Sequence, residues 1–169
     1  MPLLVDINKQ VLKLYDGSNL KSTYPISTAL NGVGQKIGSE CTPLGAHIIR
    51  AKIGAGAPLN AVFVARRQTG EIYSRVLEQQ SQLEGNPRDW ILTRILWLSG
   101  REVGRNRLGE CDTMRRFIYI HGCPDSHQMQ TPNSHGCIKM RNADVVDLFD
   151  RVFVGESIDI VESDDSHVV

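Results

Sequence analysis

The sequence lacks a long apolar run and an export signal. No stretch approaches the roughly 18 apolar residues that a membrane-spanning helix requires. Residues 1–6 have no basic segment of the kind that opens a signal peptide, and an alternating strand pattern begins there at once. We therefore expect a cytoplasmic protein without a membrane partner. The alternative is a periplasmic or cell-wall protein whose signal peptide has been removed.

A surplus of one charge sign is also absent. The chain has 19 Lys and Arg residues and 19 Asp and Glu residues, and its isoelectric point is near 7.0. A neutral balance argues against nucleic acid as the main partner. No glycine-rich phosphate loop stands between a strand and a helix, so no nucleotide cofactor is predicted.

Cysteine is scarce, with four residues that show no disulfide-scaffold spacing: Cys41, Cys111, Cys123 and Cys137. Dispersed cysteines are typical of a reducing compartment, where thiols stay free. Low-complexity segments and internal repeats are missing too. A chain of 169 residues with 41% hydrophobic residues can bury its own core, so we expect one domain over residues 1–169, in an oligomeric state that the sequence does not determine.

The chemistry-bearing residues concentrate in residues 116–147. Residues 117–120 form a β-branched and aromatic run that predicts a buried strand with His121 at its end. A loop rich in turn formers follows and returns to Cys137. From Asn142 onward, apolar residues recur at helical spacing. We therefore expect Cys137 to lie between a strand end and the start of a helix.

This placement predicts a reactive thiol. A helix N-terminus and an imidazolium both lower a cysteine pKa, and the loop can bring His121 back to Cys137 as its base. The backbone N–H groups of Gly136 and Cys137 are candidates for stabilising an oxyanion. A disulfide between Cys123 and Cys137 under oxidising conditions is a further hypothesis.

A metal site is the competing interpretation of the same segment. Zinc-competent side chains recur there, and a binding module without turnover, carrying zinc or free thiols, would follow from them. Their spacing fits no common zinc finger, and the chain is large enough to fold without a metal. We therefore expect no metal. The side chains concerned are His121, Cys123, His127, His135 and Cys137.

The remaining chain predicts a mainly β fold. Residues 3–14 alternate as a hairpin, residues 24–30 and 91–98 predict further strands, and residues 156–161 a closing strand. Residues 72–83 fit a short helix or a loop. The expected architecture is a mostly antiparallel β-sandwich or twisted barrel with one main helix after Cys137. His47 is expected to be an exposed or a core-satisfied strand residue rather than a catalytic one.

Five short motifs resemble one known family, the L,D-transpeptidase (YkuD-type) catalytic domain. They are HG at 121–122, SHGCIKM at 134–140, QVLKLY at 10–15, IST at 26–28 and TPLG at 42–45. The similarity extends from about residue 5 to residue 162. It implies the YkuD-like β fold of mixed strands for this chain.

The resemblance also implies roles for individual residues. Cys137 would be the nucleophile and His121 its base, oriented by the carbonyl of Gly122. Ser134, His135 and Gly136 would form the wall of the site and its oxyanion hole. The family commonly has Thr at Cys123 and Arg at Lys139, so the cation that binds the substrate carboxylate is open. Lys139 and Arg141 are the candidates, and the planar guanidinium of Arg141 is the better match.

The substrate implied by the resemblance is a peptidoglycan stem tetrapeptide. The bond cut would join the L-centre of the diamino acid at position three to the following D-Ala. Since no export signal is present, we expect an L,D-carboxypeptidase that trims soluble muropeptides during cell-wall recycling. The alternative is an exported L,D-transpeptidase that forms crosslinks or exchanges D-amino acids. Acylation of Cys137 by carbapenems is a further expectation from the resemblance.

Overall fold

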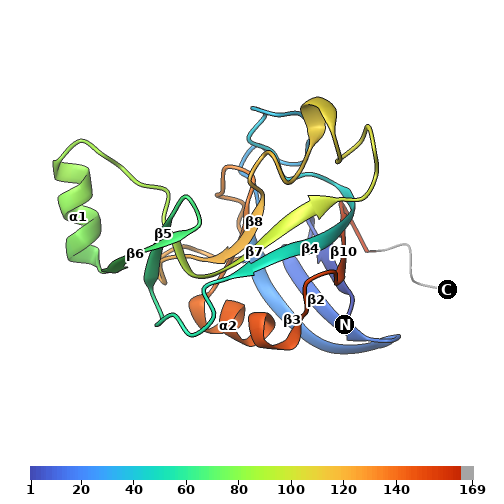
Figure 1. Ribbon diagram of the computed structural model, residues 1–169, viewed down its shortest axis with the longest axis horizontal. Coiled ribbons are helices and arrows are strands. Elements are labelled where there is room, and N and C mark those ends of the chain that lie inside the picture. Colours follow the sequence, from blue (N-terminus) through green and yellow to red (C-terminus); the bar gives the residue numbers. More distant parts are fainter. Residues whose placement is uncertain (165–169) are drawn as a thin grey trace.

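The computed structural model describes residues 1–164, so the last five residues of the predicted domain lie outside the described part. Within residues 1–164, ten strands, two α-helices and one short 3-10 helix (Gly109–Cys111) are formed. Figure 1 shows their arrangement. The strands are β1 (Leu3–Asp6), β2 (Val11–Asp16), β3 (Asn19–Ser27), β4 (Gly45–Ile53), β5 (Ala61–Val64), β6 (Arg67–Ile72), β7 (Ile91–Gly100), β8 (Tyr119–Gly122), β9 (Ile138–Met140) and β10 (Ser157–Val161). The helices are α1 (Arg75–Leu83) and α2 (Asn142–Arg151).

All ten strands belong to one sheet that closes on itself. Their order is β4-β10-β1-β2-β3-β9-β8-β7-β5-β6, and β4 also pairs with β7. Because β4 pairs with β7, the eight strands from β4 to β7 in this order close into a barrel. Strands β5 and β6 lie outside the barrel and extend from β7 as a ribbon. Two pairings are parallel, β1–β10 and β8–β9, and the others are antiparallel. The predicted mainly β, barrel-like fold of mixed strands is confirmed.

The barrel core follows from alternation along the strands. Leu3 and Val5 of β1 pair with Leu14 and Leu12 of β2, and all four side chains are buried. Because successive strand residues face opposite sides of a sheet, these residues share the inner face. The predicted hairpin over residues 3–14 is therefore confirmed.

Helix α2 closes one side of this core. Val145, Leu148 and Phe149 recur at helical spacing and are buried against the barrel. The helix packs on β7 and β8, so it supports the strand that carries His121. It is the main helix predicted after Cys137.

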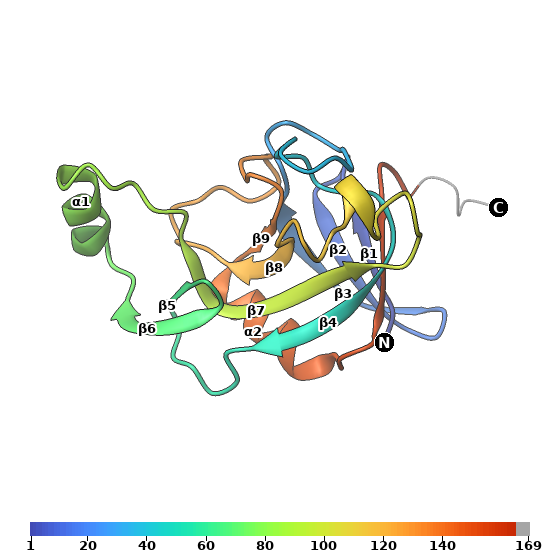
Figure 2. The same cartoon turned by 45° about the horizontal axis from the view of Figure 1, so that its top comes forward.

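A strand–helix arm projects from the barrel beside β7. It consists of β5, β6, α1 and the segment that returns to β7, and both ribbon views show α1 at its tip (Figures 1 and 2). The hydroxyl of Ser74 caps α1 by accepting a hydrogen bond from the N–H of Leu77. Tyr73 and Leu77 then pack against buried Trp90. The predicted choice between a helix and a loop for residues 72–83 is therefore resolved in favour of a helix.

His47 is a buried strand residue with both ring nitrogens in hydrogen bonds. Its Nδ1 lies 2.9 Å from the carbonyl oxygen of Gly45, and its Nε2 lies 2.9 Å from Oγ1 of Thr113. Burial lowers the pKa of His47 to about 4. Of the two environments expected for His47, exposed or core-satisfied, the structure shows the core-satisfied one.

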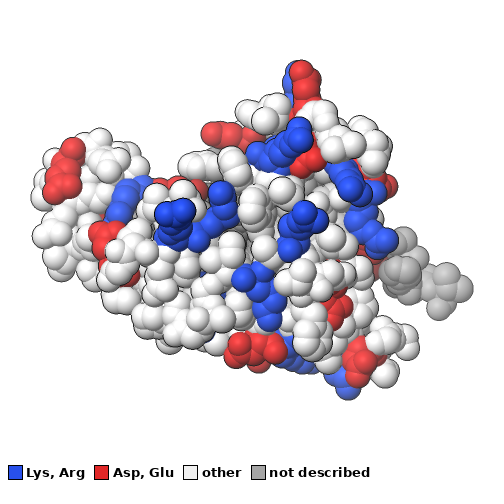
Figure 3. All heavy atoms as spheres, viewed as in Figure 1, with Lys and Arg blue, Asp and Glu red and all other residues white. Residues whose placement is uncertain are grey.

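The charge of the surface is unevenly distributed although the formal net charge is zero. Figure 3 shows Lys and Arg side chains across the middle of one face, while most of the Asp and Glu side chains lie towards its margins. Such a distribution favours anionic ligands at the centre of that face.

Within residues 1–164, no helix has both the length and the apolar character needed to cross a membrane.

Candidate active site

The site is built on the parallel pair β8 and β9, whose alternating residues face two different environments. The register pairs Ile120 with Ile138 and His121 with Lys139. The even-numbered side chains enter the barrel core: Ile118, Ile120, Ile138 and Met140. The odd-numbered side chains line a cavity on the other side of the sheet: Tyr119, His121, Cys137 and Lys139. One pair of strands therefore anchors the core and presents the reactive groups.

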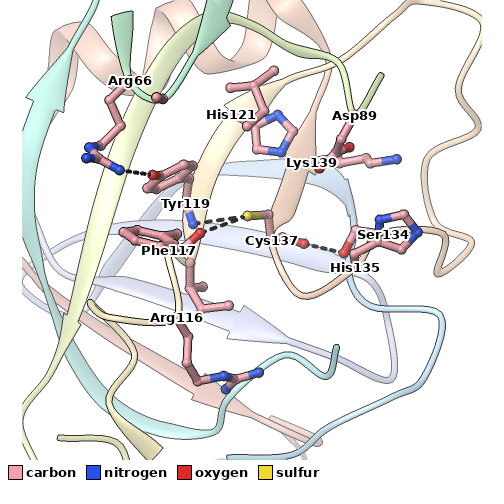
Figure 4. Close-up of a pocket in the computed structure, with 13 residues that line it drawn as sticks. Arg66, Asp89, Arg116, Phe117, Tyr119, His121, Ser134, His135, Cys137 and Lys139 are labelled. Atoms are coloured by element: carbon pink, nitrogen blue, oxygen red, sulfur yellow. Dashed lines mark hydrogen bonds between the residues drawn. The ribbon is translucent and has the colours of Figure 1, made fainter. Parts of the chain in front are cut away.

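The cavity has a volume of about 490 Å³. His121 and Cys137 both line it and are drawn next to one another in Figure 4. Their positions are diagonal on neighbouring strands, which places their Cα atoms about 8 Å apart by sheet geometry. Imidazole and thiol side chains can meet across that separation. The sequence predicted that the loop after His121 brings Cys137 back to it. The pairing of β8 with β9 does this.

The imidazole of His121 is fixed in one tautomer. Its Nδ1 lies 2.7 Å from the carbonyl oxygen of Gly122, and because a carbonyl only accepts, Nδ1 carries the proton. The other nitrogen, Nε2, is left as the basic one. Burial lowers the pKa of His121 below its ordinary value, so the ring is neutral at pH 7 and can accept a proton.

The thiol of Cys137 is held by two main-chain groups. The N–H of Tyr119 donates to its sulfur at 3.3 Å, and the thiol donates to the carbonyl oxygen of Phe117 at 3.3 Å. Burial raises the pKa of Cys137 to about 12, while the Tyr119 N–H acts in the opposite direction. The resting pair is therefore a neutral thiol beside a neutral imidazole.

The predicted helix N-terminus beside Cys137 is wrong. Strand β9 follows Cys137 directly, and α2 begins only at Asn142. The helix dipole effect is confined to the first turn, so it does not act on the sulfur from there. The expected lowering of the thiol pKa is consequently wrong for the resting structure. A sequence pattern cannot show a three-residue strand inserted before a helix.

Phe117 adopts a backbone conformation that is rare for a bulky residue. Its φ is 55°, in the left-handed region. The predicted strand over residues 117–120 therefore starts two residues later, at Tyr119. This turn directs the Phe117 carbonyl to the thiol of Cys137. Backbone strain of this type concentrates at functional sites, and no sequence signal marks it.

Ser134 organises the turn that enters Cys137. Its hydroxyl donates to the carbonyl oxygen of Cys137 at 2.5 Å and accepts from the N–H of Gly136 at 3.2 Å. The Gly136 N–H is therefore engaged and does not point at a substrate, contrary to the predicted oxyanion hole. The N–H of Cys137 stays the predicted donor. Gly136 itself is required, because its φ is 130° and an added Cβ would lie 3.1 Å from Ile118.

The two candidate carboxylate-binding cations lie in different places. Lys139 lines the cavity, and its Nζ lies 3.1 Å from Oδ1 of Asn133. Arg141 is exposed at the start of α2 and is not among the cavity-lining residues. The structure therefore favours Lys139 over Arg141, which the sequence had favoured, as the cation beside the reactive pair. His135 lines the cavity wall as expected.

Arg66, Asp89 and Tyr119 line the cavity and were not predicted from the sequence as site residues. Arg66 comes from the turn between β5 and β6, donates to the hydroxyl of Tyr119 at 3.0 Å and lies over the ring of Trp97. Asp89 comes from the end of the projecting arm. Of these three residues, Tyr119 had a usable signal, because it precedes His121 by two residues on one strand and shares its face.

The described residues form neither a disulfide between Cys123 and Cys137 nor a three-ligand metal cluster. Cys123 is buried and its thiol donates to the carbonyl of Met140 at 3.4 Å. The register places Cys123 and Cys137 roughly 14 Å apart, well beyond the Cα separation of a disulfide. Burial raises the pKa of Cys123 to about 11. Within residues 1–164, no three His, Cys, Asp or Glu side chains are grouped so that they could hold a metal ion.

Comparison with known proteins supports the resemblance seen in the motifs. The profile of the YkuD family, described as L,D-transpeptidase catalytic domain, matches residues 3–160. No curated protein sequence matches the chain.

Several solved structures share the fold at low identity. An L,D-transpeptidase from Mycobacterium smegmatis is 18% identical with a TM-score of 0.53, covering 94% of this chain and 57% of that one. One from Xylanimonas cellulosilytica is 15% identical with a TM-score of 0.53, covering 94% and 59%. L,D-transpeptidase 3 from Mycobacterium tuberculosis, in complex with a faropenem-derived adduct, is 12% identical with a TM-score of 0.52, covering 94% and 58%. The chain thus spans less than two thirds of the length of these proteins.

Proposed function

Because the chain belongs to the L,D-transpeptidase catalytic domain family, we propose that it transfers the acyl group of a peptidoglycan stem tetrapeptide to Cys137 and then to water. The products would be a tripeptide and free D-Ala, which makes the protein an L,D-carboxypeptidase. One observation carries the proposal: an imidazole with a fixed tautomer and a thiol line the same cavity on adjacent strands.

The acylation half-reaction follows from the neutral resting pair. Nε2 of His121 takes the thiol proton as the sulfur attacks the carbonyl carbon at the L-centre of residue three. The N–H of Tyr119 already lies at the sulfur and stabilises its developing negative charge. The C–N bond then breaks, the imidazolium protonates the departing amine of D-Ala, and a thioester with Cys137 remains.

Hydrolysis returns the site to its starting state. His121, neutral again, takes a proton from a water molecule that attacks the thioester carbonyl. The C–S bond breaks, the acid product leaves, and the imidazolium returns the proton to the sulfur. The carbonyl oxygen of Gly122 lies 2.7 Å from Nδ1 of His121 and keeps the proton on that nitrogen. Nε2 therefore transfers the proton in both half-reactions.

The charges in the cavity support a stem peptide as the donor. The lining includes the cations Arg66, Arg116 and Lys139 and a single carboxylate, Asp89. A tetrapeptide stem carries several carboxylates, including the terminal one of the D-Ala that leaves. Cationic side chains around a cavity favour such an anionic ligand.

The same charges favour water as the acceptor. An acceptor amine approaches as an ammonium ion, which three cations repel. One observation favours the alternative, a transpeptidase: a second depression of about 310 Å³ shares Arg116, Phe117, Ile118 and His135 with the cavity and offers room for another stem. Arg115 and Glu40 also line that depression.

End-product analysis on a defined stem tetrapeptide tests the proposal. We expect tripeptide and free D-Ala from the wild-type protein, unchanged when a D-amino acid is added, and no product from Cys137→Ser. Exchange of the added D-amino acid or formation of peptide dimers would identify a transpeptidase. Absence of D-Ala release by the wild-type protein, with no product of either kind, would overturn both candidates.

Acylation of Cys137 by β-lactams is part of the proposal. The structure of a family relative carries a faropenem-derived adduct, and a strained lactam carbonyl offers the same target for the sulfur as the stem peptide. A mass increase of the intact protein on incubation with a carbapenem, absent in Cys137→Ser, is the expected result. A cytoplasmic location stays a prediction from the sequence, which cell fractionation checks.

A further inference from the structure

Asp89 is the single carboxylate in a cavity otherwise lined by cations. It lines the cavity together with His121 and Cys137, at the point where the projecting arm returns to β7. Figure 4 shows it on the same side of the sulfur as His121 and Lys139. No other acidic side chain in the described chain lines this cavity.

The residues on both sides of Asp89 fix its position. Arg88 makes two hydrogen bonds to the carboxylate of Glu71, at 3.0 and 3.3 Å, and lies over the ring of Trp90 at 4.2 Å. Trp90 is buried and packs edge-on against Tyr73 of the arm. The arm thus holds the backbone at Asp89 against the barrel through these contacts.

The carboxylate of Asp89 is not neutralised by the cavity's own cations. Within residues 1–164 it has no hydrogen bond or ion pair, and it is exposed. The neighbouring cations have other partners: Arg66 bonds to Tyr119, Arg116 donates to the carbonyl oxygen of Cys41 at 2.6 Å, and Lys139 contacts Asn133. Asp89 therefore presents a negative charge to whatever enters the cavity.

The charge of Asp89 is felt at the reactive pair. Burial is the main cause of the raised pKa of Cys137, and the negative charge of Asp89 adds to it. The same charge opposes the lowering of the His121 pKa that burial causes. A ligand group bound at Asp89 is thus within electrostatic range of the sulfur.

We infer that Asp89 is a specificity-determining residue that binds the side-chain ammonium of the diamino acid at position three of the donor peptide. The inference rests on the proposed function. Residue three supplies the carbonyl that Cys137 attacks, so its side chain must lie in the cavity beside the sulfur. Three cations match the carboxylates of the donor, and Asp89 matches the side-chain ammonium of its residue three. With Asp89 occupied by the donor, an acceptor ammonium meets the cations alone.

The experiment compares two tetrapeptides that differ only at that ammonium. One has lysine at position three, and the other has Nε-acetyl-lysine, which lacks the charge. We expect the wild-type protein to prefer the peptide with unmodified lysine about two- to fivefold in kcat/KM, the range for a solvent-accessible ion pair. Asp89→Asn should reduce the preference to less than about 1.5-fold, and Asp89→Lys should invert it. Asp89→Glu should restore it.

Glu84→Gln is the matched control, since Glu84 is an exposed carboxylate of the same arm that does not line the cavity. It should leave the preference unchanged. A wild-type protein that hydrolyses both peptides equally well would overturn the inference. An equal loss on both peptides in Asp89→Asn would also overturn it, because a purely structural role affects both substrates alike.

Binding to Cys137→Ser separates this inference from the proposed function. Affinities of the two peptides for that inactive variant, measured by calorimetry with and without Asp89→Asn, need no turnover. The wild-type protein could hydrolyse neither peptide while Cys137→Ser binds the lysine peptide more tightly than the acetylated one, and only when Asp89 is present. That result would overturn the proposed function and support the binding of the ammonium by Asp89. If the wild-type protein hydrolyses the peptides but Cys137→Ser binds both equally well, the role of Asp89 is overturned and the proposed function is kept.

Discussion

The main-chain N–H of Tyr119 donates a hydrogen bond to the sulfur of Cys137 at 3.3 Å. A backbone donor cannot be removed by changing a side chain, and it stabilises negative charge on the sulfur. Burial nevertheless keeps the resting sulfur protonated, with a pKa of about 12. The nucleophile is therefore prepared for attack without being ionised beforehand.

A neutral pair predicts slow and pH-dependent alkylation of Cys137. At pH 7 the thiolate fraction is minute, so iodoacetamide should modify Cys137 more slowly than the partly exposed Cys41, and the rate should still rise above pH 9. Peptide mapping by mass spectrometry after timed alkylation measures both sites. Rapid modification of Cys137 with a plateau near pH 7 would indicate a preformed thiolate–imidazolium pair instead.

The lowered pKa of His121 predicts activity that persists in mildly acidic solution. His121 must be neutral to take the thiol proton, so kcat/KM falls only when the pH drops through its pKa. Because burial lowers that pKa, the acidic limb of the profile should lie below the ordinary histidine value of about 6.5. A pH–rate profile measures it, and a limb at or above 7 would contradict the assignment.

Lys139 should matter more for substrate binding than Arg141. Lys139→Met removes a cation from the cavity wall and should raise KM about tenfold or more, the range for a charged hydrogen bond. Lys139→Arg should retain most of the affinity because it keeps the charge. Arg141→Met, a matched change at an exposed position outside the cavity, should change KM less than about threefold. Steady-state kinetics of the three variants give the ranking, and the reverse order would return the role to Arg141.

Ser134→Ala should lower both stability and rate. The change leaves the Cys137 carbonyl and the Gly136 N–H without their shared hydroxyl, which costs about 1–3 kcal/mol of unfolding free energy at a buried site. The turn that presents the sulfur loosens, so kcat should fall while KM changes little. Urea unfolding and kinetics measure the two effects. Ser18→Ala, in an exposed turn, is the control and should be neutral.

His47 predicts a loss of stability in acid. Its folded-state pKa of about 4 is below the unfolded value near 6.5, so the unfolded chain binds the extra proton first. The stability contributed by neutral His47 is complete above pH 6.5 and falls as the pH drops towards 4, by about 3 kcal/mol in all. Urea unfolding measures the free energy of unfolding at pH 7 and pH 4.5. The difference between the two values should be smaller for His47→Gln than for the wild-type protein. An equal difference in both proteins would place the acid sensitivity elsewhere.

The sequence predicted those parts of the fold that depend on periodicity and turn chemistry. The hairpin over residues 3–14, the strand over residues 91–98 and helix α2 all have a repeat that binary patterning reveals. The approach of His121 and Cys137 was predicted as well, because ordered motifs surround both residues.

The predictions failed where the determining interaction is not local. Strand β9 has three residues, and its existence depends on partners in β3 and β8 that lie far away in the sequence. The left-handed turn at Phe117 and the arm that delivers Asp89 are likewise set by tertiary contacts. For the same reason, the sequence did not indicate that Lys139 lines the cavity and Arg141 does not: spacing alone does not show which face of a strand or helix a side chain occupies.

The alternation along β8 and β9 makes catalysis and folding inseparable in an evolutionary sense. A single inserted residue between 119 and 122 would reverse which side chains face inward, burying the imidazole in the hydrocarbon interior and turning isoleucines out to the solvent. Insertions and deletions are therefore not tolerated in this segment during evolution. New specificities must arise in the loops and the arm that border it.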